Sequence, residues 1–159
     1  MGKTLERLIN HRLMQFLDIV QGIHPRQYGF TKGKSTEMAI MDMVEQVKTY
    51  DQTFVMAVSL DIAGAFDNAW WPQILWQLRL LECPGNIYWM ITSFVTDRKC
   101  ALEMGAHKEE KVLTKGCPQG SVLGPILCNV IFEGLLRLDL PHGCMIYGYA
   151  DDGLLLVPA

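Results

Sequence analysis

The sequence lacks any long apolar run and any segment that would direct it into a membrane or out of the cell. No stretch approaches the roughly 18 consecutive apolar residues that indicate a membrane-spanning helix. The N-terminus also lacks the basic stretch, apolar segment and small-residue cleavage site of a signal peptide. We therefore expect no signal peptide, no membrane partner and an intracellular location.

The cysteines lack the pairing that zinc sites and disulfide frameworks require. There are five, an odd number, and none forms a C-x-x-C pair. Zinc sites usually contain such pairs, and small secreted domains carry an even number of cysteines. The sequence favours neither kind of site, and a reducing compartment is the expected one.

The sequence also lacks a strong net charge. The formal charge is −3, which creates no overall field that would attract a polyanion. The charge is unevenly distributed, however, because residues 1–36 hold six basic and two acidic side chains, a net +4. This segment either forms a basic face that meets a polyanion or is a solvated basic helix and loop, and the pattern favours neither.

Apolar residues are abundant enough for a folded core, since half of the chain is hydrophobic. Helical spacing, capping residues and β-branched runs divide the chain into elements. The predicted helices cover residues 4–17, 35–50, 71–81, 87–95 and 125–138. The predicted strands cover 53–62, 99–104 and 111–116, with two short strands within 144–157. This order predicts an α+β fold with an antiparallel sheet and helices packed on one face.

Two of these elements carry more specific predictions. Residues 53–62 form an almost continuous apolar, β-branched run, which is typical of a strand buried on both faces. In the helix over 35–50, four apolar residues share one side at helical spacing: Met38, Met41, Val44 and Val47.

Three aspartates stand at the ends of predicted strands. Asp61 ends the strand over 53–62, and Asp151 and Asp152 lie between the two short strands of 144–157. If these strands are neighbours, three carboxylates converge, which is unfavourable unless a cation neutralises them. Oxygen ligands without His or Cys nearby favour Mg²⁺ or Mn²⁺, and two such ions about 3.5–4 Å apart promote in-line phosphoryl transfer. An ordinary turn is the alternative, because Asp is common in turns.

One stretch imitates a phosphate-binding loop. Residues 29–36, "GFTKGKST", resemble the pattern G-x-x-x-x-G-K-[ST]. The first glycine of that pattern would fall at Tyr28, and Gly29 leaves one intervening residue too few before Gly33. No uninterrupted apolar strand precedes the segment either. The sequence therefore argues against a P-loop NTPase.

Five segments, in order, resemble motifs of reverse transcriptases. "YADD" (149–152) matches their signature tetrapeptide, and "VSLDIAGAFDNAW" (58–70) resembles their first palm motif. "KGCPQGSVLGPILCNVIF" (115–132) resembles the motif between these two, in its non-LTR form. "QYGFTKGKSTEMAI" (27–40) resembles the fingers motif, and "LERLINHRL" (5–13) resembles the segment before it. The chain is thus similar to part of the RNA-directed DNA polymerase of a non-LTR (LINE-type) retrotransposon.

The resemblance implies a right-hand polymerase, with fingers-side helices and a loop over 1–52 and a palm core over 53–159. The implied partners are an RNA template, a DNA primer and deoxynucleoside triphosphates, in the nucleus or cytoplasm. The chain stops seven residues after Asp152. We therefore expect a fragment of a polyprotein whose remainder supplies a thumb and an endonuclease.

The resemblance assigns metal ligands as well. Asp61 and Asp151 would be the main ligands of two Mg²⁺ (or Mn²⁺) ions, and Asp152 an outer ligand, because neighbouring side chains diverge. The carbonyl of Ile62 would add another ligand. These groups would catalyse nucleotidyl transfer.

A nucleotide site is implied beside these ligands. Gly64 and Ala65 are small, so backbone N–H groups there could approach a triphosphate. Phe66 takes the position of an aromatic residue that excludes the 2′-hydroxyl of ribonucleotides. Gln119 would lie beside the templating base pair.

The basic residues of the fingers motif depart from the family. Many relatives carry an arginine at the position of Thr31, where it grips the triphosphate. Lys32 and Lys34 could supply charge to the nucleotide but not a bidentate contact.

Two functions from different classes remain open. The first is the palm of an RNA-directed DNA polymerase. The alternative is a non-catalytic, degenerate remnant that at most binds nucleic acid or a partner protein. The acids, Phe66 and Gln119 favour the first, and the missing thumb favours the second for this chain alone.

Overall fold

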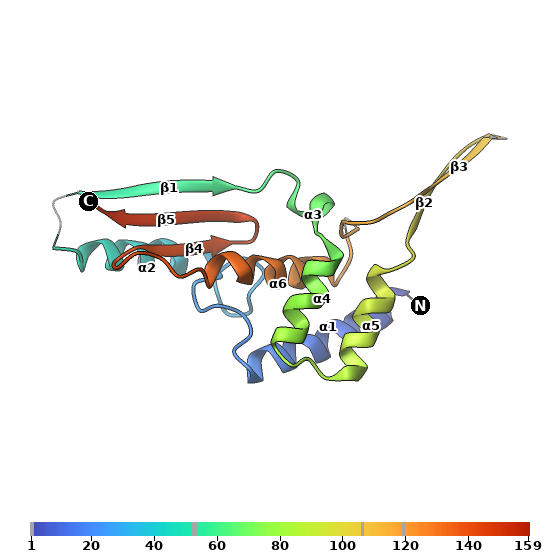
Figure 1. Cartoon of the computed structure of the whole chain (residues 1–159), viewed down its shortest axis with the longest axis horizontal. Helices are drawn as coiled ribbons and strands as arrows, with labels where there is room; N and C mark the ends of the chain where they lie inside the picture. Colours follow the sequence, from blue (N-terminus) through green and yellow to red (C-terminus); the bar gives the residue numbers. More distant parts are fainter. Residues whose placement is uncertain (1, 52–53, 106, 119) are drawn as a thin grey trace.

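The structure is a computed structural model that describes residues 2–51, 54–105, 107–118 and 120–159 (Figure 1). Its helices are α1 (Gly2–Ile19), α2 (Thr36–Lys48), α3 (Ala65–Asn68), α4 (Trp71–Leu80), α5 (Gly85–Val95) and α6 (Gly124–Leu136). Its strands are β1 (Val55–Asp61), β2 (Lys99–Met104), β3 (His107–Val112), β4 (Met145–Tyr149) and β5 (Asp152–Pro158). The predicted α+β class with antiparallel sheets is confirmed, and the short helix α3 is the element that the sequence did not predict. None of the helices in the described ranges is both long and apolar enough to span a membrane.

A three-stranded antiparallel sheet in the order β1-β5-β4 forms the centre of the fold. The second strand of the terminal hairpin, β5, is therefore the central strand, and β1 lies at an edge (Figure 1). The prediction that the first strand is buried on both faces is wrong, because no residue of β1 is buried. An apolar, β-branched run indicates that a segment favours the strand conformation. It does not indicate how many neighbouring strands and helices cover that strand.

Helices contact both faces of this sheet, so the prediction that they occupy one face is corrected. On one face, a cluster joins the sheet to α6; it contains Leu60, Phe132, Leu136, Ile146 and Leu155. On the other face, a cluster joins the sheet to α2; it contains Tyr28, Ala39, Met43, Tyr147, Leu154 and Leu156. Alternation of side chains along β5 separates the two sets. The sheet is thus covered by α6 on one side and partly by α2 on the other.

Two glycines define how α6 meets the sheet. Gly153 of β5 is paired in register with Leu60 on one side and with Gly148 on the other. A Cβ at Gly148 would lie 2.9 Å from the ring of Phe132, and one at Gly153 would lie 3.3 Å from the Leu60 Cβ. The Phe132 ring of α6 therefore packs under both glycines and leaves no room for a side chain at Gly148. This contact favours the observed register of β4 with β5, one residue away from Asp152.

The largest core lies beside the sheet, where α1, α4, α5 and α6 pack together (Figure 1). Its fully buried side chains include Leu13, Leu17, Ile74, Leu78, Ile91 and Leu127. Each such side chain contributes about 1.5–3 kcal/mol through its burial. The core packs α1 against α4, α5 and α6, and it thereby holds α6 in place beneath the sheet.

Two parts of the fold, the apolar side of α2 and a two-stranded hairpin, are not packed against other described residues. The four residues predicted to share one side of α2 do so, but that side is exposed, and Ala39 is the buried residue of this helix. The predicted strands over 99–104 and 111–116 correspond to β2 and β3, which form a hairpin that projects from the body of the fold with every strand residue exposed (Figure 1). The predicted bounds of the second strand are corrected, because β3 runs from His107 to Val112.

Candidate active site

The three predicted acids lie at one end of the β1-β5-β4 sheet. Asp61 is the last residue of β1 and is paired in register with Asp152, the first residue of β5. Asp152 is paired in turn with Tyr149 of β4. Directly paired residues of antiparallel strands place their side chains on the same face. Asp61 and Asp152 therefore share the face opposite to Leu60, which packs toward α6.

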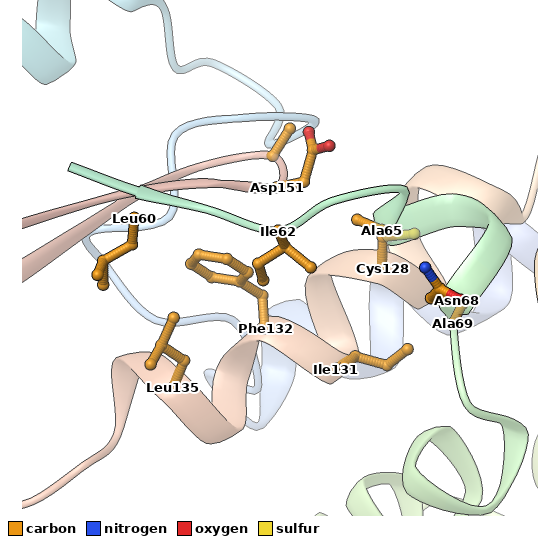
Figure 2. A pocket seen from close by; sticks show the side chains of 11 residues that line it. Leu60, Ile62, Ala65, Asn68, Ala69, Cys128, Ile131, Phe132, Leu135 and Asp151 are labelled. Atoms are coloured by element: carbon orange, nitrogen blue, oxygen red, sulfur yellow. The ribbon is translucent and has the colours of Figure 1, made fainter.

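Asp151 lies in the two-residue turn between β4 and β5. The turn residue before it, Ala150, is buried and has φ +59°, a conformation that L side chains adopt rarely. Asp151 is half-buried and lines a cavity of about 430 Å³ with Ile62 and apolar residues of α6. Figure 2 shows its carboxylate pointing away from the apolar side chains that form the floor of this cavity.

The acids are brought to one end of the sheet, but they do not form a ready-made metal site. Among the described residues, no group of three or more His, Cys, Asp or Glu side chains is placed to hold a metal ion. None of the ion pairs found in these ranges involves Asp61, Asp151 or Asp152. Carboxylate oxygens without a basic partner are suitable ligands for a hard divalent cation. The donor set therefore fits Mg²⁺ or Mn²⁺ in its chemistry.

The segment after Asp61 makes a sharp turn into α3. Gly64 has φ +60° and caps this helix, and its carbonyl accepts a hydrogen bond from the N–H of Asn68 at 2.8 Å. The Ile62 side chain lines the cavity next to Asp151, and Ala65 lines it from α3 (Figure 2). The left-handed conformation at Gly64 is available to glycine without strain.

Phe66 connects the fingers loop to the segment of the first acid. Its ring lies edge-on to that of Phe30, with 6.0 Å between the centroids. Its carbonyl accepts a hydrogen bond from the N–H of Cys117 at 2.7 Å, and the Gly116 N–H donates to the Ala69 carbonyl at 2.8 Å. The loop before the predicted template residue is thus tied to α3. Gln119 itself lies outside the described residues.

The two lysines of the fingers loop differ in their surroundings. Lys32 is exposed. Lys34 donates hydrogen bonds to the carbonyls of Pro25 and Gln27, the latter at 3.0 Å, and burial lowers the pKa of its ammonium group. Thr31 donates to the Gly29 carbonyl at 3.1 Å. Lys34 therefore closes the loop on itself, and the structure does not direct its charge toward the acids.

Sequence reasoning missed two buried amides next to the acids. Gln27 and Asn129 are both inaccessible to solvent. Gln27 forms hydrogen bonds to the turn at Ala150, and Asn129 of α6 donates to the Gly29 carbonyl at 2.9 Å. Both residues lie within motifs noted above, but an uncharged amide gives no indication in the sequence that it is buried.

A buried carboxylate holds the start of the same loop. Glu133 of α6 accepts hydrogen bonds from the backbone N–H of His24 at 2.5 Å and from the Arg137 side chain at 2.7 Å. Burial raises the pKa of Glu133. The His24 Nδ1 accepts a hydrogen bond from the Arg26 N–H at 3.1 Å, which requires an unprotonated Nδ1, and burial lowers the pKa of His24.

Comparison with protein families shows which family the chain resembles over its whole length. The family described as reverse transcriptase (RNA-dependent DNA polymerase) matches residues 1–159. The chain belongs to the reverse transcriptase family. This is a family of nucleotidyltransferases, and the prediction made from the five motifs is confirmed.

Relatives of this reverse transcriptase segment come from non-LTR retrotransposons. The Pol polyprotein of the type-1 retrotransposable element R1 of Bradysia coprophila is 35% identical over the whole chain, which covers 16% of that protein. The probable RNA-directed DNA polymerase of the X-element of Drosophila melanogaster is 36% identical over 95% of the chain, which covers 17% of that protein. The chain therefore spans about a sixth of the length of these relatives.

Solved structures support the fold. The apo telomerase of Candida tropicalis, truncated from its C-terminal domain, superposes on 96% of the chain with a TM-score of 0.73 at 14% identity; the match covers 34% of that structure. Telomerase of Candida albicans in complex with a fragment of telomeric RNA superposes on 99% of the chain with a TM-score of 0.62 at 14% identity, covering 29% of that structure. The predicted right-hand polymerase fold is thus confirmed.

We predict that acid destabilises the reverse transcriptase segment partly through His24. Because burial lowers the pKa of His24, the folded protein favours the neutral imidazole, and its contribution is complete above the unfolded pKa of about 6.5. That contribution is lost as the pH falls below this value and through the lower pKa of His24 in the folded protein. Urea unfolding at pH 7.5 and 5.5 should show a smaller loss of stability in His24→Asn than in the wild type.

The exposed His11 provides the matched control, since His11→Asn should behave as the wild type does. Equal pH dependence in His24→Asn and wild type would contradict the prediction.

Proposed function

We propose that the chain forms the fingers base and palm of an RNA-directed DNA polymerase that uses two metal ions for nucleotidyl transfer. The observation that carries this proposal is the placement of Asp61, Asp151 and Asp152 at one end of the sheet, in a chain of the reverse transcriptase family. In this assignment, residues 1–52 belong to the fingers side and residues 53–159 to the palm.

The acids and one carbonyl would hold the metal ions. Asp61 and Asp151 would supply the main carboxylate ligands, Asp152 an outer one, and Ile62 its backbone carbonyl. Bound Mg²⁺ would lower the pKa of the primer hydroxyl and neutralise charge on the departing pyrophosphate. The exposed position of Asp61 and the half-buried position of Asp151 leave both carboxylates accessible to an ion. Within the described ranges no ion pair involves these acids, and their mutual repulsion is the physical reason that such an ion would bind.

The segment from Gly64 to Phe66 would form the sugar and triphosphate side of the site. Gly64 gives the backbone a tight turn directly after the ligands, and Ala65 adds little bulk. The Phe66 ring is held edge-on by Phe30, so it is less free to move aside for a 2′-hydroxyl. Gln119 would contact the templating pair from the loop that is tied to α3.

Charge would be supplied mainly by the exposed basic residues of the first 36 positions. Lys32 is available to a nucleotide or a template, whereas Lys34 would act by holding the loop in shape. An RNA template, a DNA primer and deoxynucleoside triphosphates are the proposed partners. Because the relatives are about six times longer than the chain, the remainder of such a polyprotein is a further proposed partner.

The metal proposal predicts that the chain binds Mn²⁺ through Asp151. Mn²⁺ should stabilise the wild-type chain against unfolding, because a ligand that binds the folded state selectively stabilises it by mass action. Asp151→Asn should lose most of this gain, as measured by thermal unfolding with and without millimolar Mn²⁺. The exposed Asp139 makes the same substitution available as a control, and Asp139→Asn should keep the gain. A wild-type melting temperature that does not change with Mn²⁺ would favour the alternative, a non-catalytic remnant.

The sugar-selection proposal predicts relaxed discrimination in Phe66→Ala. The test is primer extension on RNA by a chimera in which these 159 residues replace the matching segment of the R1 polyprotein of Bradysia coprophila. Removing the ring should raise ribonucleotide incorporation relative to deoxynucleotide incorporation, because it opens space for the 2′-hydroxyl. Asp151→Asn in the same chimera controls for contaminating polymerase. Unchanged discrimination in an active Phe66→Ala chimera would assign Phe66 to packing alone.

A further inference from the structure

We infer that Gln27 is a positioning residue, which holds the turn that carries Asp151 through the amide group of its side chain. This inference rests on the proposed function of the three acids. It concerns a residue that lies outside the set of ligands and nucleotide contacts described above.

The Gln27 amide uses both of its polar atoms on the turn and the adjacent loop. Its Oε1 accepts hydrogen bonds from the N–H of Gly29 at 3.1 Å and from the N–H of Ala150 at 3.2 Å. Its Nε2 donates to the carbonyl of Ala150 at 3.3 Å. Because the side chain is completely buried, water cannot replace these hydrogen bonds. One side chain therefore satisfies both backbone groups of the residue next to Asp151.

The backbone around Gln27 extends the same contact. Residues 26–28 lie along β4, where the Tyr28 N–H donates to the Gly148 carbonyl at 2.8 Å and the Gly148 N–H donates to the Arg26 carbonyl at 2.9 Å. Gln27 and Gly148 form a parallel β-bridge. A loop of the fingers motif thus pairs with the outer edge of the hairpin immediately before its turn.

Gly29 brings the loop against the turn itself. A Cβ at this position would lie 1.9 Å from the Ala150 nitrogen, so a side chain there is sterically impossible without moving the turn. On its other side, the Gly29 carbonyl accepts the hydrogen bond from Asn129 of α6. Residues 26–29 are thus anchored between α6 and the hairpin.

The turn needs such support for two physical reasons. Ala150 has a left-handed backbone conformation, which is unfavourable for a residue with a side chain. Asp151 and Asp152 are adjacent acids that repel each other when ionised. Without hydrogen bonds to Ala150, the turn would relax toward a less strained conformation and carry Asp151 with it. The buried N–H and carbonyl of Ala150 require an acceptor and a donor at the end of one side chain, which an amide provides and an ionised Glu or a Met does not.

The test compares Gln27→Met with Gln77→Met in the 159-residue chain. Gln77 is also buried, but it lies on α4, so the control removes a buried amide from another part of the fold. The readouts are the Mn²⁺ dissociation constant, the hydrogen-exchange rate of the Ala150 amide and the urea stability. We expect Gln27→Met to weaken Mn²⁺ binding about 10–100-fold, the range typical when a group that orients a metal ligand is lost. The Ala150 amide should also exchange faster. Gln77→Met should lower stability while leaving both the dissociation constant and the Ala150 exchange unchanged.

Each outcome decides the inference. Equal Mn²⁺ affinities for the folded Gln27→Met and Gln77→Met proteins would overturn it, because Gln27 would then be merely structural. If Gln27→Met does not fold, Gln27→Asn keeps a buried amide that is one methylene too short to reach the turn, and the same losses are expected. If the wild type binds no Mn²⁺, the proposed function fails, and the exchange rate of the Ala150 amide alone decides whether Gln27 holds the turn.

Discussion

The register between β1 and β5 is the constraint on which the candidate site depends. A slip of one residue would place Asp61 on the face that packs against α6 and bring Leu60 to its place beside Asp152. Leu60 opposes this slip, because its pairing with Gly153 places its side chain in the apolar cluster with Phe132 of α6, where a slip would put the carboxylate of Asp61 instead. The apolar contact on one face of the sheet thus determines that Asp61 and Asp152 lie on the other.

The turn between β4 and β5 also depends on a contact with another part of the chain. The sheet pairs Asp61 with Asp152, but pairing alone leaves the conformation of Ala150 and Asp151 undetermined. Hydrogen bonds from residues 26–29 reach this turn from a segment more than 100 positions earlier in the chain. The loop over residues 26–29 therefore contacts the turn next to Asp151 directly, through the Gln27 side chain and through backbone hydrogen bonds to Gly148. Lys34, which the sequence suggested as a nucleotide contact, instead stabilises this loop by donating hydrogen bonds to the carbonyls of Pro25 and Gln27.

Much of the fold was predictable because its elements have strong local patterns. The spacing of Leu13, Leu17, Ile74 and Leu78 predicted helices whose apolar sides are buried, and the two short strands predicted within 144–157 are β4 and β5. The family was predictable from motif order, and it is confirmed over the whole chain.

The rest depends on tertiary neighbours that periodicity does not report. The run in β1 does not show that this strand lies at an edge, and the apolar side of α2 is exposed although its spacing is regular. The acids were predicted as a group, yet the structure pairs Asp61 with Asp152 and leaves Asp151 in a separate turn. Gln27 and Asn129 were missed because burial converts an ordinary amide into a specific contact, and burial is a property of the assembled fold.

We propose that strand register and the loop over residues 26–29 together create a divalent-cation site at one end of the sheet. Paramagnetic broadening of backbone amides on addition of substoichiometric Mn²⁺ to the isotopically labelled chain locates the bound ion. The amides at the end of β1 and around the turn at Asp151 and Asp152 should broaden first. Broadening that begins instead at the exposed acids of the β2–β3 hairpin, with the end of the sheet unaffected, would show that this end of the sheet is not the cation site.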